Sequence, residues 1–373
     1  MENIPFFDYP DVYTRYGLRF RELFDQISSR GSFIMQGELR DFEEKLAETS
    51  DCKYAVGVGN ATDALEMLIE YAIAKRGLAH SQGKVLVCDH TMGATAASIA
   101  RNGLEPLVVD FDDAHGMTLD RLSESEFENV VGIVPTQLNG RVCNMEPILE
   151  ACTTRDLFLV EDSAQGLGAC YKGRSAGSFG LGGCLSFYPA KVVGALGDAG
   201  AVITNDRDVR DWLRLARDHG RNPETGRIEF WGRNSRLDNI QAAFLCEVLD
   251  NYDQIQSRRR DVASLYCTEL ASVSEVVTPE SPDDATVHHD IFQNFEIRAQ
   301  SRDQLRSYLS DKGVGTLIQW GGVRISDVGA TQKTSLPFSD SEFSKLLMLP
   351  LNLTITDAQV RLVVSHIKDF YGR

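Results

Sequence analysis

Lys191 is the residue whose surroundings raise the clearest chemical question. It is the only basic side chain in the apolar, glycine-rich stretch CLSFYPAKVVGALGDAGAVITND, residues 184–206. A buried lysine must find a partner or lower its pKa and lose its proton, and a neutral lysine is a nucleophile toward carbonyl carbon. The alternative is a lysine whose stem packs while its ammonium reaches water. The neighbouring motifs have to distinguish the two.

A second candidate is the carboxylate of Asp162 in FLVEDSAQ, residues 158–165. A carboxylate directly after an apolar strand is costly unless a cation or hydrogen bonds meet it. A protonated pyridine nitrogen would be such a partner. Gln165, three residues later, is placed to reach the same ligand. The alternative is that Asp162 only caps a turn or a helix.

The third feature is the turn GVGNATDAL, residues 57–65, which opens directly into a helical pattern. The backbone amides of Ala61 and Thr62, the Thr62 hydroxyl and the helix dipole predict an anion site suited to phosphate. The turn half-matches the dinucleotide fingerprint G-x-G-x-x-G, but its last position is Thr62. A plain helix start is the alternative.

Taken together, these features predict that a single ligand contacts all of them. Ser186 precedes Lys191 by five residues, with Pro189 between them, and is placed to donate to a phosphate on the same molecule. Pyridoxal 5′-phosphate (PLP) carries an aldehyde for the lysine, a phosphate for the helix start and a ring cation for Asp162. The sequence therefore predicts a PLP site.

Two other functions remain open from the residues alone. A nicotinamide-dependent oxidoreductase built on GVGNAT would use Asp89 to hold the ribose, but it leaves Lys191 and Asp162 without roles. A PLP-binding regulator without turnover would need an added DNA-binding segment or a lost lysine, and neither is visible. A chromophore that borohydride discharges would separate PLP from nicotinamide.

The elements that position these residues follow from short runs rich in β-branched residues, which alternate with helical or turn segments. The runs predict strands buried on both faces at residues 54–60, 84–90, 105–112, 130–137 and 156–165, with further strands in CLSFYP and GAVITND. Open α/β sheets bind ligands at the carboxyl ends of their strands. We expect an α/β fold with a mostly parallel sheet flanked by helices and a smaller C-terminal α/β domain.

After residue 206 the pattern changes. Residues 207–220 predict a helix that ends at Gly220. Ser235, with Asp238 three residues on, resembles a capping box for a long helix that starts near Arg236 and runs past Tyr252. We place the domain boundary in this helix, which gives a large PLP-binding domain over 1–250 and a small C-terminal domain over 251–373.

Composition excludes several classes of protein. The 373 residues carry a net charge of −16, which disfavours a nucleic-acid binder. The eight cysteines form no C-x-x-C pair and no histidine cluster accompanies them, so we expect reduced thiols and no metal site. The N-terminus is unlike a signal peptide, and no apolar run is long enough to span a bilayer. The expected location is the cytoplasm.

Three long motifs together resemble one family. EDSAQGLGACYKGRSAGSFGLGGCLSFYPAKVVGALGDAGAVITND, with GNATDAL upstream and GRNSRLDNIQAAF downstream, is similar to the DegT/DnrJ/StrS sugar aminotransferases. The similarity covers nearly the whole chain, from IPFFDY to LMLPLNLTITDAQV. It implies a fold-type I PLP enzyme that acts as a homodimer, with each active site at the subunit interface.

The resemblance also implies roles for single residues. Lys191 would be the Schiff-base lysine and Asp162 the partner of the pyridine nitrogen, with Gln165 beside the ring hydroxyl. The phosphate would be held by Ala61, Thr62, Ser186 and, from the other subunit, Asn234.

The chain departs from the family pattern at positions that concern the substrate. Where many relatives have an aromatic residue that stacks on the pyridoxal ring, HTMGAT supplies Met92, with His90 beside it. LIQWGG, residues 317–322, replaces a common His-Tyr-Pro segment, and Asn352 stands where the family often has histidine. Core packing is the alternative role for Met92.

The expected reaction moves an amino group from L-glutamate to a keto or aldehyde sugar. HDIFQNFEI, IQWGG and RDHGRNPE resemble the branch that aminates the terminal carbon of the octulosonic acid Kdo, a lipopolysaccharide sugar, to give 8-amino-3,8-dideoxy-octulosonate. Nucleotide-linked keto-hexoses are the alternative substrates. A free sugar acid calls for an arginine fork, so the substrate-binding candidates are His90, Arg221, Arg233, Trp320 and Arg324.

Overall fold

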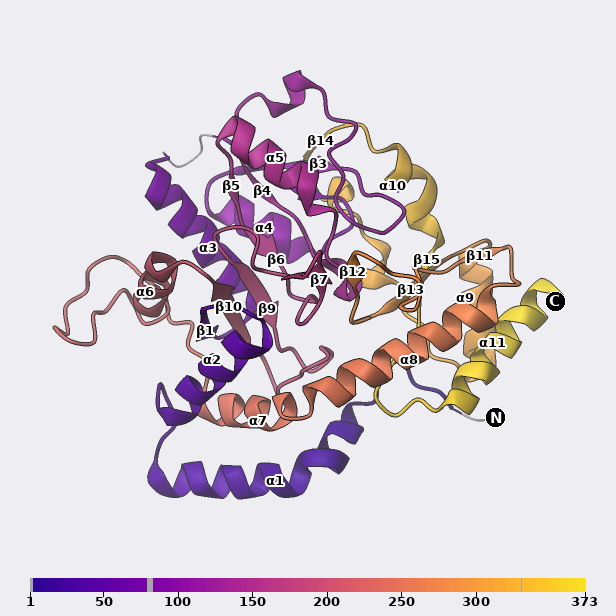
Figure 1. The fold of residues 1–373 in the computed structure, drawn as a ribbon, viewed down its shortest axis with the longest axis horizontal. Coiled ribbons are helices and arrows are strands. Elements are labelled where there is room, and N and C mark those ends of the chain that lie inside the picture. The colour runs from indigo at the N-terminus through magenta and orange to yellow at the C-terminus, as the bar shows by residue number, and fades with distance from the viewer. Residues whose placement is uncertain (1–2, 79–82, 330) are drawn as a thin grey trace.

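The computed structural model of the chain describes residues 3–78, 83–329 and 331–373. One large α/β body carries a smaller group of elements that contains the C-terminus (Figure 1). Two N-terminal helices, α1 (Tyr9–Arg30) and α2 (Gly37–Thr49), lie along the lower side of the large body in this view. An α/β fold is thereby confirmed.

The central sheet contains the strands that the β-branched runs predict. Its two described parts have the orders β1-β10-β9-β6 and β14-β3-β2-β4-β5, and the consecutive strands β5 and β6 join them. In spatial order, the described pairings β9–β6, β5–β4, β4–β2, β2–β3 and β3–β14 are all parallel. The strand β10 runs antiparallel to both of its neighbours, β1 and β9. The strands are β1 (Tyr54–Val58), β2 (Lys84–Cys88), β3 (Glu105–Val109), β4 (Val130–Val134), β5 (Phe158–Leu159), β6 (Glu161–Asp162), β9 (Gly183–Ser186), β10 (Gly200–Thr204) and β14 (Gln332–Lys333).

Helices cover both faces of this sheet and bury two apolar clusters against it. One cluster includes residues of α3 (Ala61–Arg76), α4 (Gly93–Arg101) and α6 (Arg207–Ala216). The other includes residues of α1, α2, α5 (Met145–Arg155) and α7 (Asn239–Leu249). Sheet strands buried from both sides are the expected result of near-continuous apolar runs.

The predicted start of the long helix is wrong. The helix α7 begins at Asn239 with Asp238 as its N-cap, not near Arg236. Ser235 does not cap it, because the Ser235 hydroxyl accepts the backbone N–H of Gly59 at 3.1 Å. A contact across 176 positions of sequence therefore overrides a local capping pattern.

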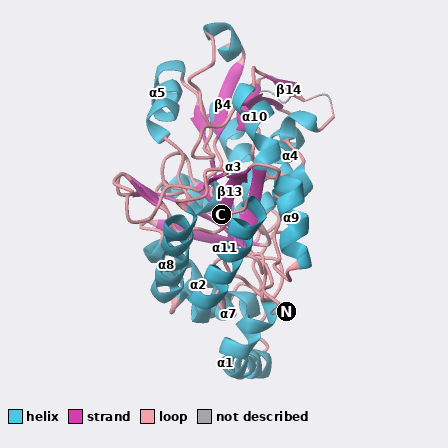
Figure 2. Cartoon of the chain, turned by 90° about the vertical axis from the view of Figure 1, so that its right-hand side faces the viewer, coloured by secondary structure: helices cyan, strands magenta, loops and turns pink. Residues whose placement is uncertain are grey.

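The C-terminal elements have an apolar cluster of their own, which also includes Ile4. In Figure 2 the helices α8 (Tyr252–Leu270), α9 (Arg302–Asp311) and α11 (Asp357–Tyr371) surround β13. The strand β13 (Phe295–Ala299) is the middle of a sheet with β11 (Val276–Val277) and β15 (Leu346–Leu349). The helices α7 and α8 are separate elements that meet near residue 250, where the domain boundary remains a prediction.

The remaining elements are short. A small sheet joins β7 (Cys170–Tyr171), β8 (Arg174–Ser175) and β12 (His288–His289). The others are α10 (Pro337–Glu342) and five 3-10 turns: η1 (Glu124–Phe127), η2 (Leu138–Gly140), η3 (Gln319–Gly322), η4 (Ile325–Asp327) and η5 (Phe343–Lys345). None of the helices in the described ranges combines the length and the apolar character needed to traverse a lipid bilayer.

Candidate active site

A cavity of about 430 Å³ opens at the carboxyl ends of the central strands. Its walls come from the start of α3, the segments that follow β2, β4 and β6, and the end of β9 with the loop after it. Residues near the N-terminus and three stretches of the C-terminal half complete them. The predicted residues that line it are Ala61, Thr62, Met92, Asp162, Gln165, Ser186, Lys191 and Trp320. Motifs that are far apart in sequence thus share one cavity of a size typical of small-molecule sites.

Lys191 lies half-buried on the cavity wall. Burial lowers the pKa of its ammonium, and the negative charge of Asp162 opposes this shift only in part. Within the described ranges, the ammonium has neither a hydrogen bond nor an ion pair. The structure therefore favours an amine that loses its proton readily over a lysine that extends into water.

Gln293 holds the backbone on both sides of Lys191. Its Nε2 donates to the carbonyl of Ala190 at 3.0 Å, and its Oε1 accepts the N–H of Val192 at 2.8 Å. The buried guanidinium of Arg259 in turn donates to the carbonyl of Gln293 at 2.6 Å. This role was not predicted from the sequence, because a glutamine in a β-like run gives no local signal of a contact 101 positions away.

Asp162 lies at the buried end of the cavity. Its Oδ2 accepts the hydroxyl of Thr95 at 2.5 Å, and its Oδ1 accepts the N–H of Ala164 at 3.1 Å. The Thr95 hydroxyl is also 2.9 Å from that of Thr91. These bonds keep the carboxylate in one orientation. Thr91 and Thr95 belong to HTMGAT, so a signal for them was present in the sequence.

The orientation of the Gln165 amide follows from its partners. Its Oε1 accepts the backbone N–H of Asn139 at 2.8 Å and Nδ2 of Asn294 at 3.3 Å. Because both bonds engage the oxygen, the amide nitrogen of Gln165 is the group left to serve a ligand in the cavity.

One end of the cavity has the features of an anion site. The Asn60 side chain caps α3 by accepting the N–H of Asp63 at 2.8 Å. The amides of Ala61 and Thr62 stand in the first turn of α3, where N–H groups lack intrahelical acceptors. A Cβ at Gly200 would lie 2.6 Å from the amide nitrogen of Ala61, so only glycine permits this close approach.

These residues fit PLP as the sequence predicts. The cavity brings together an amine with a lowered pKa, a fixed carboxylate, and a helix start beside the Ser186 hydroxyl. They would meet the aldehyde, the ring nitrogen and the phosphate respectively. Met92 also lines the cavity and is 52% exposed, which leaves its face free to contact a ring.

Four substrate-binding candidates lie away from the cavity. His90 is 1% exposed and is bonded through Nε2 to Glu296 at 2.9 Å, so we reassign it from substrate contact to that pair. The three arginines hold carboxylates of the same chain: Arg221 that of Asp218, Arg233 those of Glu66 and Glu70, and Arg324 those of Asp327 and Asp340. Asn234 is exposed and outside this subunit's cavity.

Fold and cavity together define the class of PLP-dependent aminotransferases. The model of the DegT/DnrJ/EryC1/StrS aminotransferase family matches residues 17–368, and the chain belongs to this family. Solved structures of this fold include PLP and PMP forms. The predicted family, fold, enzyme class and cofactor are therefore confirmed.

Individual relatives are similar over their whole length. The chain is 30% identical to the "Pleiotropic regulatory protein" of Geobacillus stearothermophilus, over 99% of each protein. It is 31% identical to the dTDP-3-amino-3,4,6-trideoxy-alpha-D-glucose transaminase of Streptomyces venezuelae, over 99% of this chain and 97% of the relative. A DegT DnrJ EryC1 StrS aminotransferase from Brucella abortus has a TM-score of 0.90 at 29% identity, with 100% of both chains covered.

Proposed function

We propose that this aminotransferase transfers the amino group of L-glutamate to a keto carbon of a nucleotide-linked sugar. The observation that carries the proposal is the convergence of Lys191, Asp162 and the start of α3 on one cavity. The named dTDP-sugar transaminases among its relatives support the substrate class. The narrower prediction, an oxidised Kdo, has no such support, and Lys191 is the only basic residue among the described residues of the cavity wall.

The chain's own groups account for the chemistry expected of this class. PLP supplies an aldehyde that accepts the amino group and a ring that takes up the electrons released at the substrate carbon. The Lys191 amine, with its lowered pKa, is the group that moves the proton. Asp162, fixed by Thr95 and Ala164, holds a proton at the ring nitrogen. Ser186 and the amides of Ala61 and Thr62 bind the phosphate.

We also propose a cytoplasmic homodimer in which Asn234 completes the partner's phosphate site. The segment between α6 and α7 extends from the body at the left of Figure 1. Its Trp231 is 89% exposed, and Tyr188 at the cavity is 51% exposed. Large exposed aromatic side chains on a protruding segment and at an open cavity are typical of an interface. The partner subunit would cover them and bring Asn234 to the phosphate.

The direct test is turnover by purified holoenzyme. L-Glutamate is incubated with keto sugars linked to dTDP, UDP or GDP, and separately with an oxidised octulosonate, and 2-oxoglutarate is measured. Release with a nucleotide-linked sugar, absent in Lys191→Ala, is the expected result. Release only with the octulosonate would replace the proposed substrate by Kdo. PLP binding without turnover of any donor would favour a regulatory protein.

A further inference from the structure

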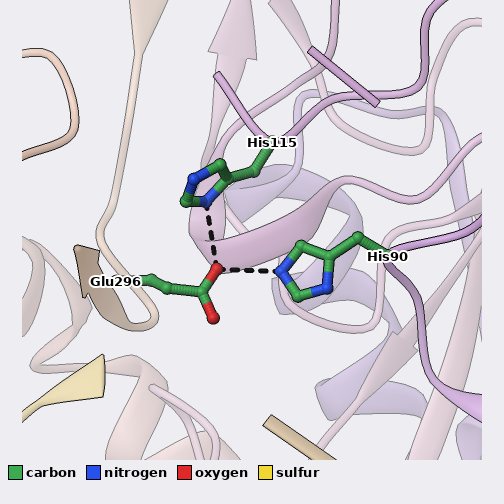
Figure 3. Close-up of side chains that lie close together, drawn as sticks. All are labelled: His90, His115 and Glu296. Carbon is green, nitrogen blue, oxygen red and sulfur yellow. Dashed lines mark hydrogen bonds and ion pairs between the residues drawn. The ribbon is translucent and has the colours of Figure 1, made fainter. Parts of the chain in front are cut away.

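Glu296 on β13 is a buried carboxylate on which four side chains converge. It is 2% exposed, and Figure 3 shows two imidazoles directed at one of its oxygens. That Oε2 lies 2.9 Å from Nε2 of His90 and 3.0 Å from Nδ1 of His115, and it accepts Nδ2 of Asn139 at 2.9 Å. Its other oxygen accepts Nε2 of Gln319 at 3.0 Å. We call these five residues the Glu296 cluster.

The cluster connects three loops of the large body with the C-terminal half. His90 follows β2, His115 follows β3 and Asn139 lies in η2, whereas Glu296 and Gln319 come from the C-terminal half. Burial alone would raise the pKa of Glu296, but His90 and His115 hold this pKa well below its usual range. The carboxylate is therefore ionised and fixes all four donors around it.

His90, His115 and Glu296 also have the composition of a metal site, since their ligand atoms lie within 4.8 Å of one another. The amides argue for hydrogen bonding instead. Oδ1 of Asn139 accepts Nε2 of Gln319 at 2.8 Å and Nδ2 of Asn294 at 3.0 Å, which turns the Asn139 N–H groups toward Glu296. Oriented donors already satisfy the carboxylate, and they would face a cation with the wrong polarity.

Two chains of contacts lead from Glu296 to the cavity. Through Asn139, whose backbone N–H donates to Oε1 of Gln165 at 2.8 Å, it reaches the amide that would serve PLP in the cavity. Through Gln319 it reaches Trp320 on the cavity wall. Trp320 has a φ of 49°, a left-handed conformation that a bulky residue keeps only where surrounding contacts impose it.

We propose that Glu296 is a positioning residue that sets the orientation of Gln165 and of the Gln319–Trp320 wall. Cofactor affinity and acceptor selectivity then depend on a carboxylate that touches neither molecule. The acceptor part of this inference rests on the proposed sugar aminotransferase function, whereas the cofactor part does not.

The test measures two quantities: PLP affinity of the apoprotein by equilibrium titration, and KM and kcat for the keto-sugar acceptor. In Glu296→Gln the amide nitrogen would face donors, so we expect about a tenfold loss of PLP affinity and about a tenfold rise in acceptor KM. Glu275→Gln, a control at an ion pair with Arg373, should leave both unchanged.

His115 provides a second, matched pair of variants in case Glu296→Gln folds poorly. His115 bonds Glu296 through Nδ1 and has φ of 64°. An asparagine places its amide nitrogen near the Nδ1 position and tolerates this φ. We therefore expect His115→Asn to bind PLP within about twofold of wild type, and His115→Ala to lose affinity severalfold.

Three outcomes would overturn the proposal. Folded Glu296→Gln with wild-type PLP affinity and acceptor KM would show that the cluster does not reach the cavity. Equal affinities of His115→Asn and His115→Ala would show that the donor is irrelevant. One Zn²⁺ per wild-type chain, found by metal analysis and lost in Glu296→Gln, would make Glu296 a metal ligand. Failure of the proposed function is seen separately, as no turnover of any keto sugar by wild type.

Discussion

Replacing Gln293 by leucine tests whether the backbone around Lys191 is held for chemistry or only for stability. The substitution removes the bonds to the Ala190 carbonyl and the Val192 amide, at 3.0 and 2.8 Å. Gln293 and Val192 are both 6% exposed, so the freed N–H is left without water. Two lost bonds and one buried unsatisfied donor cost about 3 kcal/mol.

That cost has two measurable consequences. The entropy of unfolding scales with chain length, so in a chain of 373 residues a loss of about 3 kcal/mol in unfolding free energy lowers Tm by about 4 °C. Differential scanning fluorimetry measures this shift. A displaced Lys191 amine should also lower kcat by about tenfold to a hundredfold, because misplacement of a reacting group by about 1 Å has effects of that size. The readout is 2-oxoglutarate release at saturating donor and acceptor.

A glutamine on α7 that bonds the same Lys191-containing loop provides the control. Gln241 accepts the N–H of Leu196 at 3.0 Å, five positions beyond Lys191, and Leu196 is 50% exposed. Gln241→Leu should therefore lower Tm by less and leave kcat unchanged. Gln293→Leu with lowered Tm and wild-type kcat would refute the idea that the two Gln293 hydrogen bonds position the Lys191 amine.

Three further predictions follow from the site. Asp162→Asn should keep the fold but lower kcat/KM about a hundredfold, roughly 2.7 kcal/mol, because an amide does not hold the proton at the ring nitrogen; activity assays with a circular dichroism control measure this. Because the folded-state pKa of Lys191 is lowered from 10.5, the unfolded apoprotein binds more protons below that pH, and its free energy of unfolding should rise with pH there; urea titrations should show this rise reduced in Lys191→Met. Arg233→Lys and Arg324→Lys should leave the acceptor KM within about twofold, since both arginines are engaged by carboxylates; a tenfold rise would return them to the substrate site.

Local patterns predicted the parts of this molecule that local physics determines. Strands such as β2 and β4 are short apolar runs buried on both faces, and their periodicity is readable without neighbours. The start of α7 was misplaced because Ser235 bonds Gly59, which is distant in sequence. The predicted cofactor-binding residues that line the cavity lie near the ends of strands or at the start of a helix, where local patterns are readable.

The residues that support the site were not predictable in the same way. Gln293 and Glu296 are polar positions in a strand-like run, and their partners lie about 100 and 206 positions away. The guanidinium of Arg233 is suited to bind a substrate carboxylate, but it is already paired with the carboxylates of Glu66 and Glu70 on α3. Which charges pair with each other depends on tertiary contacts, so a motif alone does not reveal whether a guanidinium is free for substrate.

Borohydride reduction of the PLP-loaded protein, followed by peptide mass spectrometry, tests the central claim most directly. We expect the mass of reduced PLP on the peptide that contains Lys191, the cavity-lining amine with a lowered pKa. The Lys191→Ala protein should bind PLP but carry no such mass on any peptide. Reduced PLP on a different lysine, or none on the wild-type protein, would contradict the assignment of Lys191 and of the cavity around it.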